Sequence, residues 1–224
     1  EPVPDHSTLW RFREQLAKSG LAERAFALIT AQIEKSGFVL KRGTLIDASL
    51  IRSAVNPPGP PDSHLPPDAD GRPASKLVKS AHDPDAAWTK KDGKYAFGYK
   101  MHVAVDRGSG LIRNGLLTSA NIQDVSVAPA LIPSEAGTVY ADRGYHSRGL
   151  REHLQARGFG DGVMRRGQRT KPLSPDEIER NHAIVPLRSP VEAVFGTLKR
   201  TYGFTRMRYF NAARNLAAYL LACM

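Results

Sequence analysis

The chain has 224 residues, 41% of them hydrophobic, and its 32 Lys and Arg outnumber its 22 Asp and Glu to give a formal net charge of +10. A chain of this length and composition can bury a full core, which excludes a low-complexity protein. Its single cysteine, Cys223, excludes an intramolecular disulfide, and the histidines show no zinc-finger spacing. The positive charge is typical of a nucleic-acid-binding protein.

Targeting signals are missing from the sequence. No secretory signal opens the chain, and the longest apolar run, residues 216–224, is far shorter than a membrane span. We therefore expect a cytoplasmic protein with no membrane partner. Because the chain begins without Met and its last predicted helix stops while still apolar, we expect the natural protein to be longer.

Two helices are predicted at the start of the chain. Apolar residues recur at helical spacing from Leu9 to Lys18 and from Leu21 to Lys35, and a Ser-Gly pair separates the two segments. We expect this helical hairpin, within residues 1–38, to be an appendage and not part of the core.

The next segments predict strands. Thr44–Ile46 is β-prone, so we expect a strand with Asp47 at its end. Residues 53–73 are rich in Pro, a composition that packs neither as helix nor as strand, and they predict an open loop. Side chains alternate from Tyr95 to Asp106 and again from Leu111 to Ser119, with a Gly-containing turn between, which predicts an antiparallel hairpin.

A second group of elements follows the hairpin. Asp124 is expected to cap a short helix, and the apolar segment Thr138–Ala141 predicts a strand in the middle of a mixed sheet, with Asp142 at its carboxyl end. Ligands collect at that edge of α/β sheets. A helix from Ser147 to Ala156 and a short strand from Gly162 to Met164 come next.

A basic loop follows that strand, formed by Arg165, Arg166, Arg169 and Lys171. Such a loop is either a solvated run of charge or a set of phosphate contacts.

The last motif before the C-terminal helix is a short amphipathic helix that begins at Ser189 and stops before Gly203. Glu192 lies in its first turn, and Lys199, seven residues later, shares its face. Arg188 directly precedes the helix. Ser189 and Glu192 also fit a capping box, which is common where there is no chemistry. The two cations are either surface charges or clamps on phosphate groups. A further alternative for Arg188 is that it is a buried ion-pair partner of Asp47 or Asp142.

Three carboxylates stand out in this order of elements. Asp47 and Asp142 at strand ends and Glu192 on a later helix follow the order of a ribonuclease H-like sheet, in which they converge. Clustered carboxylates repel one another unless cations neutralise them, and Mg²⁺ or Mn²⁺ suits oxygen ligands. Two such ions would activate the attacking oxygen and stabilise the leaving oxygen of a phosphodiester. We therefore predict an α/β fold, a ribonuclease H-like mixed sheet flanked by helices.

Segments across nearly the whole chain resemble one known family. They are PDHSTLWRFR at 4–13, GTLIDASLI at 43–51, TKKDGKYAFGYKMHVAVD at 89–106, SANIQD at 119–124, ADRGYHS at 141–147 and RSPVEAVFGTLKRTYGF at 188–204. They resemble the DDE transposases of bacterial insertion sequences, specifically the fifth insertion-sequence type of the insertion-sequence-four-like superfamily. The final sequence motif of that family is a series of Tyr, Arg, Glu and Lys. Arg188, Glu192 and Lys199 match it, and Val185 stands at the Tyr position.

The resemblance implies a bacterial transposase that cuts double-stranded DNA at insertion-sequence ends and joins the freed 3′-hydroxyl to target DNA. Asp47, Asp142 and Glu192 would hold Mg²⁺ or Mn²⁺, as two ions in the family's pattern, and the DNA-bound protein would be a homodimer. The expected DNA contacts are Arg188, Lys199, Arg165, Arg166 and Arg200.

The implied domains are a helical appendage at 1–38, a catalytic domain at 39–210 and a C-terminal helix at 211–224. Two other functions remain open. One is a domesticated or fragmentary DNA-binding protein without cleavage activity, and the other is a nuclease acting on RNA–DNA hybrids.

Overall fold

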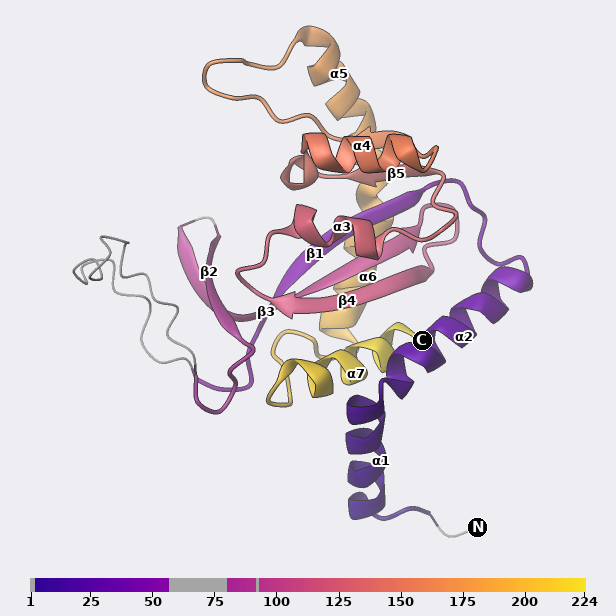
Figure 1. The fold of residues 1–224 in the computed structure, drawn as a ribbon, viewed down its shortest axis with the longest axis vertical. Coiled ribbons are helices and arrows are strands. Elements are labelled where there is room, and N and C mark those ends of the chain that lie inside the picture. The colour runs from indigo at the N-terminus through magenta and orange to yellow at the C-terminus, as the bar shows by residue number, and fades with distance from the viewer. Residues whose placement is uncertain (1–2, 57–79, 92) are drawn as a thin grey trace, which may run out of the picture.

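The computed structural model describes residues 3–56, 80–91 and 93–224, so most of the predicted Pro-rich loop at 53–73 lies outside the described residues. Its centre is a six-stranded mixed sheet with helices on both faces (Figure 1). The sheet order is β2-β3-β1-β5-β6, and β4 pairs with β3. The strands are β1 (Thr44–Arg52), β2 (Ala87–Lys91), β3 (Lys94–Asp106), β4 (Ile112–Ser119), β5 (Thr138–Ala141) and β6 (Gly160–Val163).

The helices surround this sheet, and the ribonuclease H-like mixed sheet predicted from the sequence is confirmed. None of the helices in the three described ranges is long and apolar enough to cross a bilayer. The α-helices are α1 (His6–Ser19), α2 (Leu21–Lys35), α3 (Asp124–Leu131), α4 (Arg148–Ala156), α5 (Pro175–Ile184), α6 (Ser189–Arg200) and α7 (Ala212–Cys223), and the 3₁₀ turns are η1 (Arg143–Tyr145) and η2 (Val185–Arg188).

The antiparallel half of the sheet is built around β3. This strand pairs with β1 from Thr44↔Asp106 to Arg52↔Gly98 and forms the predicted hairpin with β4. β2, which the sequence did not predict, pairs with the first residues of β3. Its five residues are too few for alternation to be distinguished from a loop.

The parallel half of the sheet consists of β5 between β1 and β6. β6 begins earlier than predicted, at a glycine. A side chain at Gly160 would place its Cβ 2.4 Å from Thr138 Oγ1, and one at Gly162 would place its Cβ 2.5 Å from the Tyr140 ring. The two glycines therefore allow β6 to lie against β5, although glycine is depleted in strands and hid the first residues of this strand from the sequence pattern.

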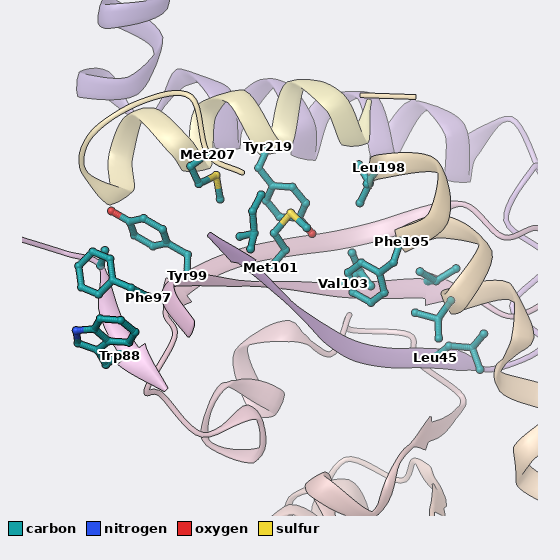
Figure 2. Close-up of a cluster of buried hydrophobic side chains, with 14 residues drawn as sticks. Leu45, Trp88, Phe97, Tyr99, Met101, Val103, Phe195, Leu198, Met207 and Tyr219 are labelled. Atoms are coloured by element: carbon teal, nitrogen blue, oxygen red, sulfur yellow. The ribbon is translucent and has the colours of Figure 1, made fainter. Parts of the chain in front are cut away.

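Two apolar cores lie on opposite faces of the sheet. The first lies under α6 and α7, and Figure 2 shows its aromatic and aliphatic side chains between α7, α6 and the strands. The second lies under α3 and α4, the helices in front of the sheet in Figure 1. Leu45, Tyr99, Met101, Val103, Phe195, Leu198 and Tyr219 belong to the first core, and Ile46, Ala128, Leu131, Val139, Ala141, Leu150 and Leu154 belong to the second.

Ion pairs tie the two N-terminal helices to the rest of the protein. Glu34 on α2 accepts from Arg113 on β4 at 2.7 Å, and the Arg113 side chain is only 2% exposed. Glu14 on α1 pairs with Arg214 on α7 at 2.6 Å. The two predicted N-terminal helices therefore pack on α7 and on the edge of the sheet, but the predicted hairpin is wrong, because α2 continues from α1 at an angle and does not fold back along it (Figure 1).

Asp83 is a fully buried carboxylate that joins three distant segments. It accepts hydrogen bonds from the hydroxyls of Ser53, just after β1, and Tyr99, on β3. It also accepts the backbone N–H of Asn211, the residue that caps α7, at 3.0 Å. A buried acceptor shared by three donors leaves all three unsatisfied when it is removed.

Replacing Asp83 with Ala should therefore destabilise the protein by about 3 kcal/mol or more, as expected when hydrogen bonds to a buried charge are lost. Urea unfolding followed by circular dichroism measures this change. The matched control is Asp85→Ala, because the exposed Asp85 also accepts from the start of α7, at Ala212 N (2.8 Å). Its loss should cost about 1 kcal/mol, as for a helix cap. Equal effects from the two variants would contradict this role of Asp83.

Candidate active site

Asp47 lies inside β1, as the fourth of its nine residues, so the prediction that it ends the strand is wrong. β1 continues because its antiparallel pairing with β3 runs on from Asp47↔Val103 to Arg52. Its parallel pairing with β5, however, covers only Thr44 and Leu45. Asp47 therefore stands just beyond the point where the parallel part of the sheet ends.

Asp142 follows β5 directly, as predicted. Its Oδ1 accepts the N–H of Gly144 at 2.8 Å, which caps the short turn η1. The register pairs Thr44 with Val139 and Leu45 with Tyr140, so extending it by two residues places Asp142 opposite Asp47. Neighbouring strands lie about 4.8 Å apart, which makes the two carboxylates neighbours.

Both carboxylates lie on the face of the sheet that α6 covers. Side chains alternate along a strand, and on β1 Leu45 and Ile51 belong to the core under α6 and α7 whereas Ile46 belongs to the opposite core. Asp47 therefore shares the face of Leu45. On β5 the same reasoning applies, since Tyr140 packs against the first core and Ala141 belongs to the second.

Glu192 lies in the first turn of α6 and is exposed. The capping-box interpretation of this residue is wrong, because the N-cap is Arg188 and no side-chain hydrogen bond to a described residue caps the start of α6. The 3₁₀ turn η2 leads directly into this helix, so Ser189 does not cap its start as the sequence predicted. The capping box occurs instead at Ser174 and Glu177, at the start of α5, a helix that the sequence analysis missed.

Arg188 links α6 to the first carboxylate. Its Nη2 donates to Asp47 Oδ2 at 2.8 Å, and the two side chains are 14% and 20% exposed. Arg188 and Glu192 are four residues apart at a helix start, a spacing that places side chains on one face. The ion pair thus brings the helix that carries Glu192 to the strand that carries Asp47.

Burial dominates the electrostatics of this site. Burial raises the pKa of Asp47 to about 6, while the charge of Arg188 and the hydrogen bond from the N–H of Ala48 oppose the shift. The negative charges of Asp142 and Asp124 raise this pKa further. Asp47 and Asp142 are therefore close enough to feel each other's charge, and a nearby cation would relieve their repulsion.

The donor chemistry fits a hard divalent cation, because carboxylate oxygens are the ligands that Mg²⁺ and Mn²⁺ prefer. The structure brings Asp47 and Asp142 together on one face and places α6 over them. It does not gather Glu192 with them into a cluster, since no group of three or more His, Cys, Asp or Glu in the described part of the chain is arranged to hold a metal ion.

The predicted DNA-binding cations lie in different surroundings. Arg165 pairs with Asp161 at 2.9 Å and is 18% exposed. Arg166 and Arg200 are exposed, and neither side chain forms an ion pair within residues 3–56, 80–91 and 93–224. Burial lowers the pKa of Lys199, and the nearby charge of Lys91 on β2 lowers it further. Two of the five predicted contacts, Arg188 and Arg165, are therefore bound to carboxylates.

The sequence analysis missed two groups beside the carboxylates. Asp124 is the first residue of α3, with Gln123 as the N-cap, so the prediction that it caps the helix is wrong. Its Oδ1 lies 2.9 Å from Lys100 Nζ. Tyr145 is buried, and its hydroxyl has no hydrogen-bond partner among the described residues. Its place three residues after Asp142 in the ADRGYHS segment was the only signal available.

Comparison with known proteins identifies related sequences. The family model of the transposase DDE domain matches residues 40–224. The transposase for insertion sequence element IS1106 of Neisseria meningitidis serogroup B is 31% identical over 218 residues, covering 96% of this chain and 74% of that protein. The zinc-bound large terminase nuclease of thermophilic phage G20c is 15% identical over 65% of this chain and 84% of that chain. Its TM-score of 0.23 is too low to support a structural argument.

The raised pKa of Asp47 predicts a pH-dependent stability. Because the folded protein holds this proton more tightly than the unfolded chain, Asp47 favours folding below pH 4, and this contribution is lost as the pH rises to about 6. In EDTA, the stability of Asp47→Asn relative to wild type should therefore rise between pH 4 and pH 6.5, by about 3 kcal/mol at most. Chemical unfolding across this range measures it. A difference that does not vary with pH would contradict the shift.

Proposed function

Since the chain belongs to the transposase DDE domain family, we propose that it is the transposase of an insertion sequence of the fifth type, in the insertion-sequence-four-like superfamily. It would cut the element's ends and join each freed 3′-hydroxyl to target DNA, holding the two ends as a DNA-bound homodimer. The catalytic domain would be residues 39–210, with the helices at 1–38 and 211–224 attached to it.

The observation that supports this proposal best is the pairing of Asp47 with Asp142. The register of β1 and β5, continued by two residues, sets Asp142 opposite Asp47, and the charge of Asp142 acts on the Asp47 carboxyl, while Glu192 lies in the first turn of the helix that follows Arg188. Two carboxylates at neighbouring positions repel each other, and this repulsion destabilises the fold. The pair is therefore not explained by a role in stability. Mutually perturbed carboxylates are instead typical of functional sites.

We propose that Asp47, Asp142 and Glu192 hold Mg²⁺ or Mn²⁺. When bound, the metal supplies Lewis-acid stabilisation of charge on the phosphate and activates the attacking oxygen. The protein positions the carboxylates through β1, β5 and α6, and it neutralises the DNA with the cations around them. In the first step a water oxygen attacks phosphorus and a 3′-hydroxyl leaves. In the second step that hydroxyl attacks a target phosphate, gives up its proton and forms the new phosphodiester, while the 3′-oxygen of the target strand leaves and is protonated.

Exposed arginines would hold the DNA backbone outside the carboxylates. Arg166 follows β6 and Arg200 ends α6, so both elements that flank the carboxylate pair carry an exposed cation. Lys199 and Lys91 extend this positive surface to β2, because the charge of Lys91 on that strand contributes to lowering the pKa of Lys199. Phosphate contacts of this kind give affinity without sequence specificity.

Replacing Glu192 with Gln should abolish cleavage of element-end DNA in Mn²⁺ and leave DNA affinity within about twofold, since the change removes a ligand charge and keeps the shape. A gel-based cleavage assay and a binding titration on the same samples measure the two effects. The control is Glu179→Gln, which makes the same change from carboxylate to carboxamide at an exposed residue of α5, and this variant should cleave normally. Normal cleavage by Glu192→Gln would refute its role. No cleavage by wild type would favour a DNA-binding protein that no longer cuts.

DNA affinity should fall steeply with salt, because each cation that neutralises a phosphate releases a condensed counterion. Arg166→Gln should reduce the slope of log affinity against log salt by about 0.9, the value of one phosphate contact. Arg165→Gln should change it less, because Arg165 is bound to Asp161. Fluorescence anisotropy with labelled duplex at several salt concentrations measures both slopes. Equal slopes for wild type and Arg166→Gln would exclude that contact.

A further inference from the structure

The ion pair between Arg188 and Asp47 uses the carboxylate that the proposed function assigns to metal. Asp47 Oδ2 accepts from Arg188 Nη2 at 2.8 Å, and Asp47 Oδ1 accepts from the N–H of Ala48 at 2.8 Å. Both oxygens of Asp47 are therefore engaged. The side chains are 14% and 20% exposed, so water screens the pair weakly. A cation that binds Asp47 must displace the guanidinium or share the carboxylate with it.

Arg188 itself is incompletely bonded in this arrangement. Its Nε is buried and has no hydrogen-bond partner among the residues that the structure describes. A guanidinium carries five N–H donors, and Asp47 accepts from one of its nitrogens. A phosphate group accepts two parallel hydrogen bonds from a guanidinium, so it offers Arg188 a fuller set of partners than Asp47 does.

The position of Arg188 allows this exchange of partners. It is the last residue of the 3₁₀ turn η2, between α5 and α6, and the next helical turn carries Glu192. Two exposed arginines that we propose as phosphate contacts precede and follow this segment in the chain, at Arg166 and Arg200. A DNA strand that reaches the carboxylates would bring phosphates close to Arg188, because the Arg188 side chain already contacts Asp47 Oδ2.

We infer that Arg188 couples DNA binding to metal binding: it neutralises Asp47 in the DNA-free protein, and a DNA phosphate draws it away and leaves the carboxylate open to a divalent cation. The inference rests on the proposed function, because it assigns the metal to Asp47 and the phosphate to DNA. This exchange prevents the Arg188 guanidinium and the divalent cation from occupying the Asp47 carboxylate together, since like charges at close range repel. It also delays metal loading until the substrate is present.

Such coupling is reciprocal, so DNA must raise metal affinity by the same factor by which metal raises DNA affinity. Couplings between protein sites are commonly about 5- to 150-fold. Removing Arg188 should raise metal affinity in the DNA-free protein and abolish most of the gain that DNA gives. A purely structural Arg188 predicts the opposite, unchanged or weaker metal binding, because the site would be disordered by its loss.

The first arm of the test titrates Mn²⁺ into the DNA-free protein and follows free Mn²⁺ by electron paramagnetic resonance. Arg188→Gln should bind Mn²⁺ at least about fivefold more tightly than wild type. Arg188→Lys should remain close to wild type, because it keeps the charge. Arg148→Gln is the matched control, since it removes one Arg from an ion pair with Glu152 on the exposed side of α4 and should change nothing. Unchanged or weaker Mn²⁺ binding by Arg188→Gln overturns the inference.

The second arm needs no variant, so it stands even if Arg188→Gln fails to fold. Wild-type protein is titrated with Mn²⁺ in the presence of a pre-cut element-end duplex, on which the cleavage step is already complete. The duplex should raise Mn²⁺ affinity about fivefold or more, and equal affinity with and without it overturns the inference. If the duplex raises Mn²⁺ affinity but the protein does not cleave DNA, the proposed reaction is rejected and the role of Arg188 is kept. If the protein cleaves DNA normally but the duplex does not change Mn²⁺ affinity, only the role of Arg188 is rejected.

Discussion

The structure depends on burying one carboxylate beside another at the place where a sheet changes from antiparallel to parallel pairing. Asp47 is largely buried on β1, and Asp142 stands opposite it where β5 ends. Taking a charge out of water is costly unless a partner compensates it, and two like charges increase that cost. Arg188 supplies the compensation, and its ion pair holds the turn before α6 against β1.

The first core explains why this arrangement can be maintained. β3 runs through the sheet as its longest strand and presents Tyr99, Met101 and Val103 to the helices α6 and α7 (Figure 2). Tyr219 on α7 packs into the same core and donates its hydroxyl to the backbone carbonyl of His102 at 2.8 Å. Because α6 and α7 share one apolar floor, the helix that carries Glu192 is positioned by contacts far from the carboxylates.

The sequence predicted those parts of the fold that have a local signal. Alternation identified β3 and β4, helical spacing identified α1 and α2, and Ser147 marked the start of α4 as its N-cap. The failures have long-range causes. The continuation of β1 past Asp47 depends on pairing with β3, and the early start of β6 depends on two glycines that fit against β5. The two carboxylates Asp47 and Asp142 were predictable as a pair, and both were candidate partners of Arg188. No local signal decided for Asp47, which is 141 residues away from Arg188 in the chain.

The buried Asp83 also bears on how chains of this fold can diverge. Its hydrogen bond from Ser53 holds the described residues that precede position 57 close to those that follow position 79. Closing a loop whose ends are already held together costs only slightly more free energy as the loop lengthens. Related chains can therefore carry segments of very different length and sequence here while β1, β3 and the carboxylates stay in register. The hydrogen bonds to Asp83 therefore allow insertions between Ser53 and Asp83 to be tolerated during evolution.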